Sequence, residues 1–404
     1  MRITGLYYTA DTSALLANPV VALVLLRNFV NTKTRVTIRN FLCFLLVGFA
    51  YPNSADLDQS SKLKRATHEL ITSLTDEQRP KTLLPLTDDR RATWSNLPVL
   101  MAPPTGIMLK DLSDQQRHLV HRMLRSSLSS QGYGKSAAIM WIDDILFEIE
   151  QDNLQSNPQE RANKTRVAIA QNRSSGNYAL AIFGNPNKDK WGWKITGHHL
   201  AVNITVAGGK IEFVPMFIGS NPRHVNSGRY AGWMALPHEG SLGIDLILSL
   251  DPEQRKKSML EVTPNDVIAG PGRRYDIKKF QGLKSALLRS NQAQKLRQLV
   301  LEYLRNAQVT AAERQLRLIE ESGWDSLWFS WAGDPGECGQ FYYRVHGERL
   351  LIEYNRQNEN HDHAILRDPL NDYGELWLQH HYEEFHPSME NVFQDLQKRI
   401  SPEA

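Results

Sequence analysis

The sequence contains very little cysteine, and this excludes the classes of protein that depend on it. Only two cysteines occur among 404 residues, Cys43 in an apolar run and Cys338 in a glycine-rich stretch. Two such distant residues build neither a CxxC cluster nor a disulfide framework. Any metal site in this chain must therefore use histidine, carboxylate and amide groups.

Runs of one charge and glycine-rich phosphate loops are also missing. The 47 basic and 44 acidic residues are interspersed, and the formal net charge is +3. No Lys/Arg stripe with interleaved aromatic residues occurs, so we expect no nucleic acid as a partner. The segment Gly132-Tyr-Gly-Lys-Ser136 lacks the spacing of a P-loop, and ATP is not indicated. The apolar fraction of 41% and the charged fraction of 23% are those of a folded globular protein.

The first 55 residues have the order of a secretory signal. Basic residues precede a short apolar run at 41–50, and small residues follow it. This order predicts export, with a mature chain that begins near Tyr51 or Asp56. The alternatives are a buried helix, a membrane anchor helped by the apolar stretch at 20–30, or a true translation start near Val36. The run at 41–50 is too short to span a bilayer comfortably, so we expect no stable membrane span in the mature chain.

Residues 56–404 predict one α+β domain in which helical and strand-rich blocks alternate. Apolar residues recur at helical spacing in some blocks and at every second position in others. The blocks are helical at 60–155 and 251–322, strand-rich at 176–220 and 326–368, and helical again at 369–404. We therefore expect an antiparallel β core with an N-terminal and an inserted helical block.

The two strand-rich blocks resemble each other. In each, a strand ends at an Asn-Pro or Asp-Pro loop, and an aromatic strand then turns through X-Gly into an apolar strand. Thr196-Gly197 and His346-Gly347 are the expected two-residue turns, because glycine supplies the positive φ that such turns need. We infer two similar hairpin units, at 191–206 and 341–355, that are related by an approximate internal two-fold axis. The alternative is that hairpins simply look alike.

Alternation along the strands places several polar side chains on one face. Residues two apart on a strand point the same way, so His199 shares a face with Asn203, and His361 shares one with His363. The candidate residues are His199, His361 and His363 as metal ligands, Glu353 and Arg367 as catalytic groups, and Asn203, Arg349 and Trp193 as further pocket residues. We expect His199, Glu353, His361 and His363 to line one cavity.

This set of residues suits a metal-dependent site. An H-x-H pair on an extended segment presents two imidazoles to one side, and imidazole is a good ligand for Zn, Cu and Fe. His199 supplies a third nitrogen, with Glu353 as a fourth ligand or general base. Arg367 is then placed to hold an anionic substrate group. A metal-free polar pocket, and a structural network in which Arg367 pairs with a nearby aspartate, stay open as alternatives.

Three segments resemble the bacterial domain-of-unknown-function family numbered 3500. They are Trp191–Asn203, Tyr343–Tyr354, and Asn360–His363 together with Arg367–Pro369. The resemblance extends from about Trp94 to Tyr382. It implies a domain assignment without an established activity, and export signals are common among its members.

The sequence therefore predicts an extracytoplasmic, metal-dependent enzyme, hydrolytic or oxidative, that acts on a small molecule. The alternative is a non-catalytic protein whose Trp/Tyr-rich strands bind a sugar or a small polar or aromatic ligand. A structural surface protein is a third possibility. The metal content of the protein separates the first two, and no pattern in the sequence indicates an oligomeric state.

Overall fold

The computed structural model describes residues 54–274, 276–336 and 339–379, which belong to one compact unit that spans Pro52–Ala404. The signal-like segment up to residue 53 and the helices expected beyond residue 379 lie outside the described residues. None of the described helices is both long enough and apolar enough to cross a membrane.

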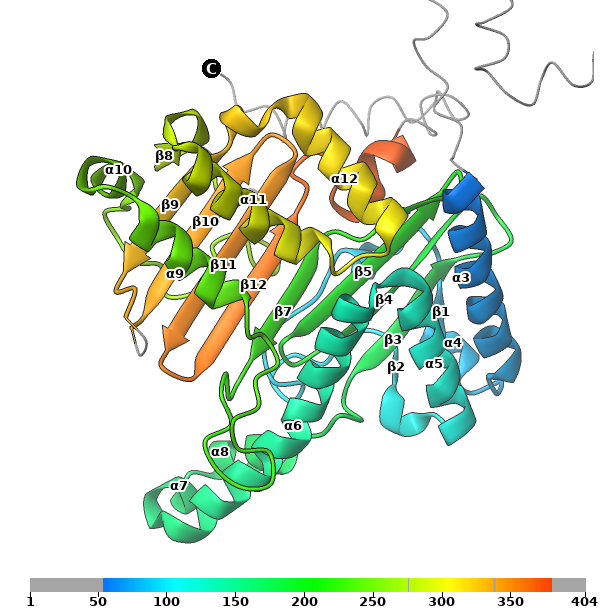
Figure 1. Cartoon of the computed structure of the whole chain (residues 1–404). Coiled ribbons are helices and arrows are strands. Elements are labelled where there is room, and N and C mark those ends of the chain that lie inside the picture. Colours follow the sequence, from blue (N-terminus) through cyan, green and yellow to red (C-terminus); the bar gives the residue numbers. More distant parts are fainter. Residues whose placement is uncertain (1–53, 275, 337–338, 380–404) are drawn as a thin grey trace, which may run out of the picture. The chain divides into compact units, whose positions relative to one another are not determined.

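A twelve-stranded sheet forms the centre of this unit (Figure 1). The strands are β1 (Leu83–Leu84), β2 (Ile107–Met108), β3 (Ala179–Gly184), β4 (Lys190–Gly197), β5 (Leu200–Ala207), β6 (Lys210–Glu212), β7 (Met216–Ser220), β8 (Leu283–Lys284), β9 (Trp328–Gly333), β10 (Phe341–Gly347), β11 (Leu350–Asn358) and β12 (His361–Arg367). Their order is β1-β3-β4-β5-β7-β12-β11-β10-β9-β8, with β2 also beside β3 and β6 beside β5. The pairing of β1 with β3 is parallel and the others are antiparallel, which confirms the predicted α+β class.

Helices cover one face of the sheet (Figure 1). The α-helices of the described residues are α3 (Ser54–Ser73), α4 (Arg79–Thr82), α5 (Asp114–Ser127), α6 (Ser130–Ser156), α7 (Pro158–Ala162), α8 (Lys164–Gln171), α9 (Glu239–Ser249), α10 (Pro252–Ser258), α11 (Ser290–Leu304) and α12 (Val309–Ser322), of which α7 and α8 lie beside the end of α6, beyond the sheet. Along β5, Leu200, Val202 and Ile204 join the main hydrophobic core with these helices. Ala201 points the other way, into a smaller cluster that contains Trp94 and residues from connecting segments. The two faces therefore have different partners, helices on one and irregular chain on the other.

The sheet is built from two halves in the arrangement that the repeat predicts. Strands β2-β3-β4-β5-β7 and β8-β9-β10-β11-β12 follow one another in mirrored order from the two edges to the centre. At the centre β7 and β12 pair antiparallel, and Met216 is opposite Leu366. The repeat also includes helices, since the side-chain amides of Gln78 and Gln116 bond each other just as those of Gln254 and Gln292 do.

The predicted turn residues of the two hairpins were wrong. Gly197 pairs with Leu200, and Gly347 pairs with Leu350, so the turns are His198-His199 and Glu348-Arg349. The glycines end their strands for a packing reason, because a Cβ at Gly197 would lie 2.5 Å from the ring of Tyr178. His199 consequently occupies the turn itself, with a φ of 62° that is uncommon for a residue other than glycine.

The predicted helical block at 251–322 is also interrupted. Helix α10 ends at Ser258, and α11 begins at Ser290. Part of the intervening chain, residues 264–273, lies on the polar face of the sheet, where Val267 packs in the smaller cluster and Asn355 Nδ2 donates to Pro264 O at 2.7 Å. We call residues 264–273 the strap. Side chains of the sheet form hydrogen bonds with the backbone of the strap. The strap therefore does not need helical hydrogen bonds to satisfy its backbone groups.

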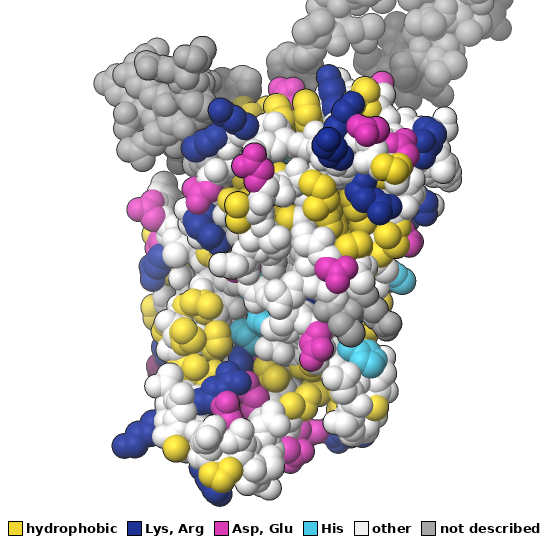
Figure 2. Space-filling view, turned by 90° about the vertical axis from the view of Figure 1, so that its left-hand side faces the viewer, with side chains coloured by type: hydrophobic (Ala, Val, Ile, Leu, Met, Phe, Trp, Pro, Cys, Tyr) yellow, Lys and Arg dark blue, Asp and Glu magenta, His cyan; other side chains and the backbone are white. Residues whose placement is uncertain are grey.

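Charged side chains of both signs are intermingled on the face of the molecule seen in Figure 2, and the hydrophobic side chains there form small separate groups.

Candidate metal centre

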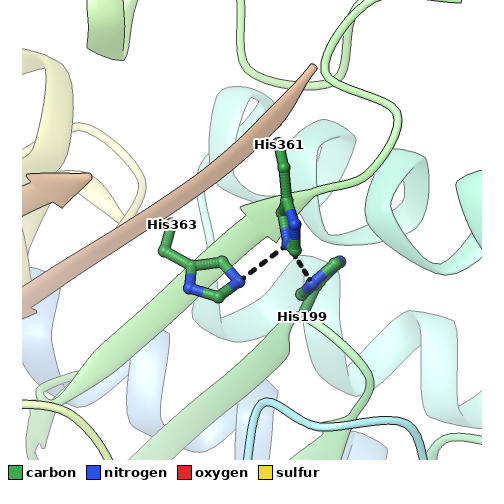
Figure 3. A group of neighbouring side chains, drawn as sticks. All are labelled: His199, His361 and His363. Atoms are coloured by element: carbon green, nitrogen blue, oxygen red, sulfur yellow. Dashed lines mark hydrogen bonds between the residues drawn. The ribbon is translucent and has the colours of Figure 1, made fainter. Parts of the chain in front are cut away.

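Three histidine side chains point toward one another at the N-terminal end of β12 (Figure 3). His361 Nε2 lies 2.9 Å from His199 Nε2 and 3.0 Å from His363 Nε2. All three ligand atoms lie within 4.8 Å of one another. Two nitrogens bound to one tetrahedral metal at 2.0–2.1 Å are about 3.3 Å apart, so each of the two His361 contacts would have to lengthen by a few tenths of an ångström to admit an ion.

The sheet order brings the three residues together. His361 and His363 lie two apart on β12, and His363 pairs with Gly219 of β7. The amide of Gly219 donates to the carbonyl of His199 at 2.8 Å, which fixes the turn beside β12. A Cβ at Gly219 would lie 3.0 Å from the His363 ring and 3.3 Å from His199 Cβ. Glycine therefore leaves the space in which the imidazoles meet.

The strap orients His363. Nδ1 of His363 lies 2.6 Å from Oδ1 of Asp266, whose carboxylate also accepts the amide of Val267 at 2.7 Å. A proton on Nδ1 that is donated to this carboxylate leaves Nε2 with a free lone pair directed at the other two rings. Carboxylate–histidine pairs of this kind fix the tautomer and raise the basicity of metal-binding imidazoles.

His199 is held by a second, buried network. Its ring stacks on that of His198, with centroids 3.7 Å apart. His198 Nδ1 contacts Asp143 of α6 at 2.7 Å, and Arg173 contacts the same ring at 3.0 Å. Arg173 in turn forms two hydrogen bonds to Glu150, at 3.0 and 3.2 Å. Helix α6 therefore sets the position of His199 through its neighbour in the turn.

The environment keeps two of the imidazoles neutral. Burial, with a contribution from the adjacent His363, lowers the pKa of His361 to about 3. Burial, followed by the neighbouring His198 and His361, holds the pKa of His199 well below its ordinary value. Burial raises the pKa of Asp266, but His363, the amide of Val267 and Arg273 together outweigh it, and the net shift is downward. At neutral pH His199 and His361 thus offer imidazole lone pairs rather than imidazolium protons.

The structure does not bring Glu353 or Arg367 into this group. Glu353 is fully buried, and its carboxylate accepts the amides of Ile268 and Ala269 at 2.7 and 2.8 Å and the Tyr342 hydroxyl at 2.6 Å. Arg367 donates to the carbonyl of Ala269 at 2.8 Å and to Asp372 at 2.5 Å. Both side chains lie on the expected face of the sheet, where they bind the strap.

The three further pocket residues lie apart from the histidines as well. Asn203 donates to the carbonyl of Pro215 at 2.8 Å. Arg349 occupies the second hairpin turn and contacts Asp368 at 2.6 Å. Trp193 of β4 pairs with Ile204 of β5 and is buried in the main core, on the helix-covered face of the sheet. Its place follows from the same alternation that puts Asn203 on the polar face.

Comparison with protein families matches residues 57–375 to the family described as "Protein of unknown function (DUF3500)". The chain belongs to this family. No curated protein and no solved structure matches it. The match to DUF3500 includes His199, His361 and His363 together with Asp143 and Asp266, so the whole candidate centre lies inside the family's domain.

Sequence reasoning missed both aspartates that support the histidines. Asp143 had a weak signal, because it is an acidic residue in the apolar run Ala137–Leu146 that forms the buried side of α6. Asp266 had none, since the strap has neither helical nor strand periodicity. Its partnership with His363, 97 residues away, exists only through the tertiary fold.

Proposed function

We propose that His199, His361 and His363 bind one divalent transition-metal ion, and that the chain is a metal-dependent enzyme. The observation that carries this proposal is the meeting of three Nε2 atoms from a hairpin turn and a strand 162 residues apart. In the neutral form His361 Nε2 carries either one proton or one lone pair, so it can make only one of its two nitrogen–nitrogen contacts a full hydrogen bond. A cation at their centre satisfies all three lone pairs.

The donor set favours Zn²⁺ or copper over iron. The group contains three imidazoles and, among the described residues, no carboxylate. Non-haem iron enzymes commonly use two histidines and one carboxylate, whereas three histidines are a known catalytic zinc set. The hydrogen bond between Asp266 and His363 adds the outer carboxylate that often accompanies such zinc ligands.

Three protein ligands leave a position for chemistry. A zinc ion with three histidines takes water or substrate as its fourth ligand, lowers the pKa of that water and polarises carbonyl oxygens. His361 is only partly buried, unlike His199 and His363, so the centre is approached from the side of His361. These features support hydrolysis of a small-molecule substrate, and the order of residues in the first 55 positions supports action outside the cytoplasm.

The test is a competition titration of metal-free protein with Zn²⁺ and a chromogenic chelator. We expect one site per chain. Loss of an outer hydrogen-bond partner lowers metal affinity by about 10–100-fold. The zinc affinity of His361→Ala, which loses a ligand, should fall by more than that. His118→Ala, which removes an exposed histidine of α5, is the matched control and should bind as the wild type does. Absence of wild-type binding, or equal affinity in the two variants, overturns the proposal.

A further inference from the structure

A cleft beside α6 exposes two large aromatic side chains, Trp141 and Tyr230. Trp141 is 55% exposed and Tyr230 is 42% exposed, whereas Trp191 and Trp193 are 2% and 1% exposed. Both line a hollow of about 690 Å³ between α6 and residues 229–233, together with Trp233. This volume lies within the range of about 300–1,000 Å³ for small-molecule sites. Burying such rings is favourable, so an exposed tryptophan and tyrosine in one hollow indicate a binding site.

Polar groups give this aromatic cleft a second chemical character. Glu148 of α6 contacts Arg229 at 2.7 Å, and the guanidinium lies 4.8 Å from the centre of the Tyr230 ring. Asp144 also lines the cleft, and its Oδ1 accepts the amide of Ser175 at 2.8 Å. The cleft thus combines ring faces with exposed carboxylates and one guanidinium.

Both walls of the cleft are tied to the proposed metal centre. Asp144 directly follows Asp143, whose carboxylate holds His198 against His199. On the other wall, the chain leading to Tyr230 begins with the amides of Arg223 and His224, which donate to Asn360 at 2.8 and 2.7 Å. Asn360 directly precedes His361. The cleft therefore shares its supporting elements with the three imidazoles.

We propose that the aromatic cleft binds a neutral sugar ring, which makes carbohydrate the substrate class of the metal centre. The apolar face of a pyranose stacks on aromatic rings, while its hydroxyls need carboxylate and guanidinium partners. An anionic ligand is disfavoured, because the one basic lining residue, Arg229, is paired with Glu148 and Asp144 adds negative charge. An aliphatic ligand is disfavoured because Ile145 and Ala231 are the only aliphatic lining residues. The assignment of a substrate rests on the proposed function, but the binding itself does not.

The experiment is calorimetric titration of the protein with tetramers of glucose, galactose, mannose and N-acetylglucosamine. We expect saturable binding of at least one of them. Trp141→Ala and Tyr230→Ala should each weaken it at least about tenfold, because aromatic anchors dominate such contacts. Phe147→Ala, which removes another exposed aromatic ring of α6, is the matched control and should bind as the wild type does. All three altered side chains are at least 37% exposed, so the variants should fold.

The two proposals fail separately. If no tetramer binds, or if the cleft variants bind as tightly as Phe147→Ala, the sugar site is overturned whatever the metal content. If His361→Ala keeps both its zinc and its sugar affinity, the metal proposal fails while the sugar site stands. We expect Trp141→Ala to retain zinc and His361→Ala to retain sugar binding.

Discussion

At the scale of single residues, Asp266 is the group on which the orientation of His363 depends. Its Oδ1 lies 2.6 Å from His363 Nδ1. Removing this acceptor frees the ring to rotate and to change its tautomer. We expect Asp266→Ala to lower the zinc affinity by about 10–100-fold without abolishing the site.

The chelator competition assay measures this effect. Asp276→Ala, which removes an exposed aspartate from the same connection between α10 and α11, is the control and should leave the affinity unchanged. Equal affinities for Asp266→Ala and the wild type would show that the carboxylate has no part in metal binding.

Glu212 makes the stability of the protein depend on pH. Burial raises its pKa to about 8, with a further contribution from Asp368, whereas the ordinary value is 4.5. Between these values the folded state keeps a proton that the unfolded state has lost. This residue therefore stabilises the fold fully at low pH, and its contribution falls as the pH rises through the window, by at most about 1.4 kcal/mol per pH unit.

We expect Glu212→Gln to flatten this fall, since an amide carries no proton to lose. Urea unfolding of the wild type and the variant at several pH values between about 5 and about 8 compares the two slopes. An unchanged slope in the variant would show that Glu212 ionises with its ordinary pKa in the folded state.

At the scale of elements, the strap is held on the sheet by Glu353. Its carboxylate accepts two strap amides and one tyrosine hydroxyl, so Glu353→Gln replaces one acceptor with a donor that faces N–H groups. We expect a loss of unfolding free energy of about 1–3 kcal/mol and faster amide hydrogen exchange in residues 264–273. Zinc should still bind at one ion per chain, because Glu353 supplies no ligand.

Glu348→Gln, at the exposed turn between β10 and β11, is the control for this change and should alter neither stability nor exchange. Loss of zinc from Glu353→Gln, with hydrogen exchange in the strap unchanged, would instead identify Glu353 as a ligand.

The accuracy of the sequence predictions also differs by element. Strand alternation assigned the correct face to Glu353, Arg367 and His363, because pleating alone decides it. Alternation does not say what lies above that face. The strap satisfies Glu353 and Arg367, and it has no periodic pattern that would have placed it there. The turn residues were misassigned because Gly197 and Gly347 are required by close packing against Tyr178 and Leu327, not by the geometry of the turns.

The internal repeat explains why the described fold has one such group of histidines. The turn residue that corresponds to His199 in the second half is Arg349, which pairs with Asp368. An ion pair thus occupies the equivalent end of the other hairpin. The two halves share a backbone plan, and the side chains at the turns determine which one can bind a cation.

At the scale of the whole molecule, the candidate centre depends on both halves of the sheet. His199 comes from the β4–β5 turn of the first half, and His361 and His363 come from the last strand of the second half. They meet because β7 lies between β5 and β12. The sequence singled out the three histidines as candidates, but the neighbours of β7 depend on long-range pairing that one sequence does not encode locally.

The most direct test of the central claim is a crystal structure of the protein loaded with Zn²⁺, with data collected at the zinc absorption edge. We predict one anomalous peak between His199, His361 and His363, about 2.0–2.1 Å from each Nε2. A peak bound by other residues, or no peak between these three rings at full zinc loading, would contradict the account.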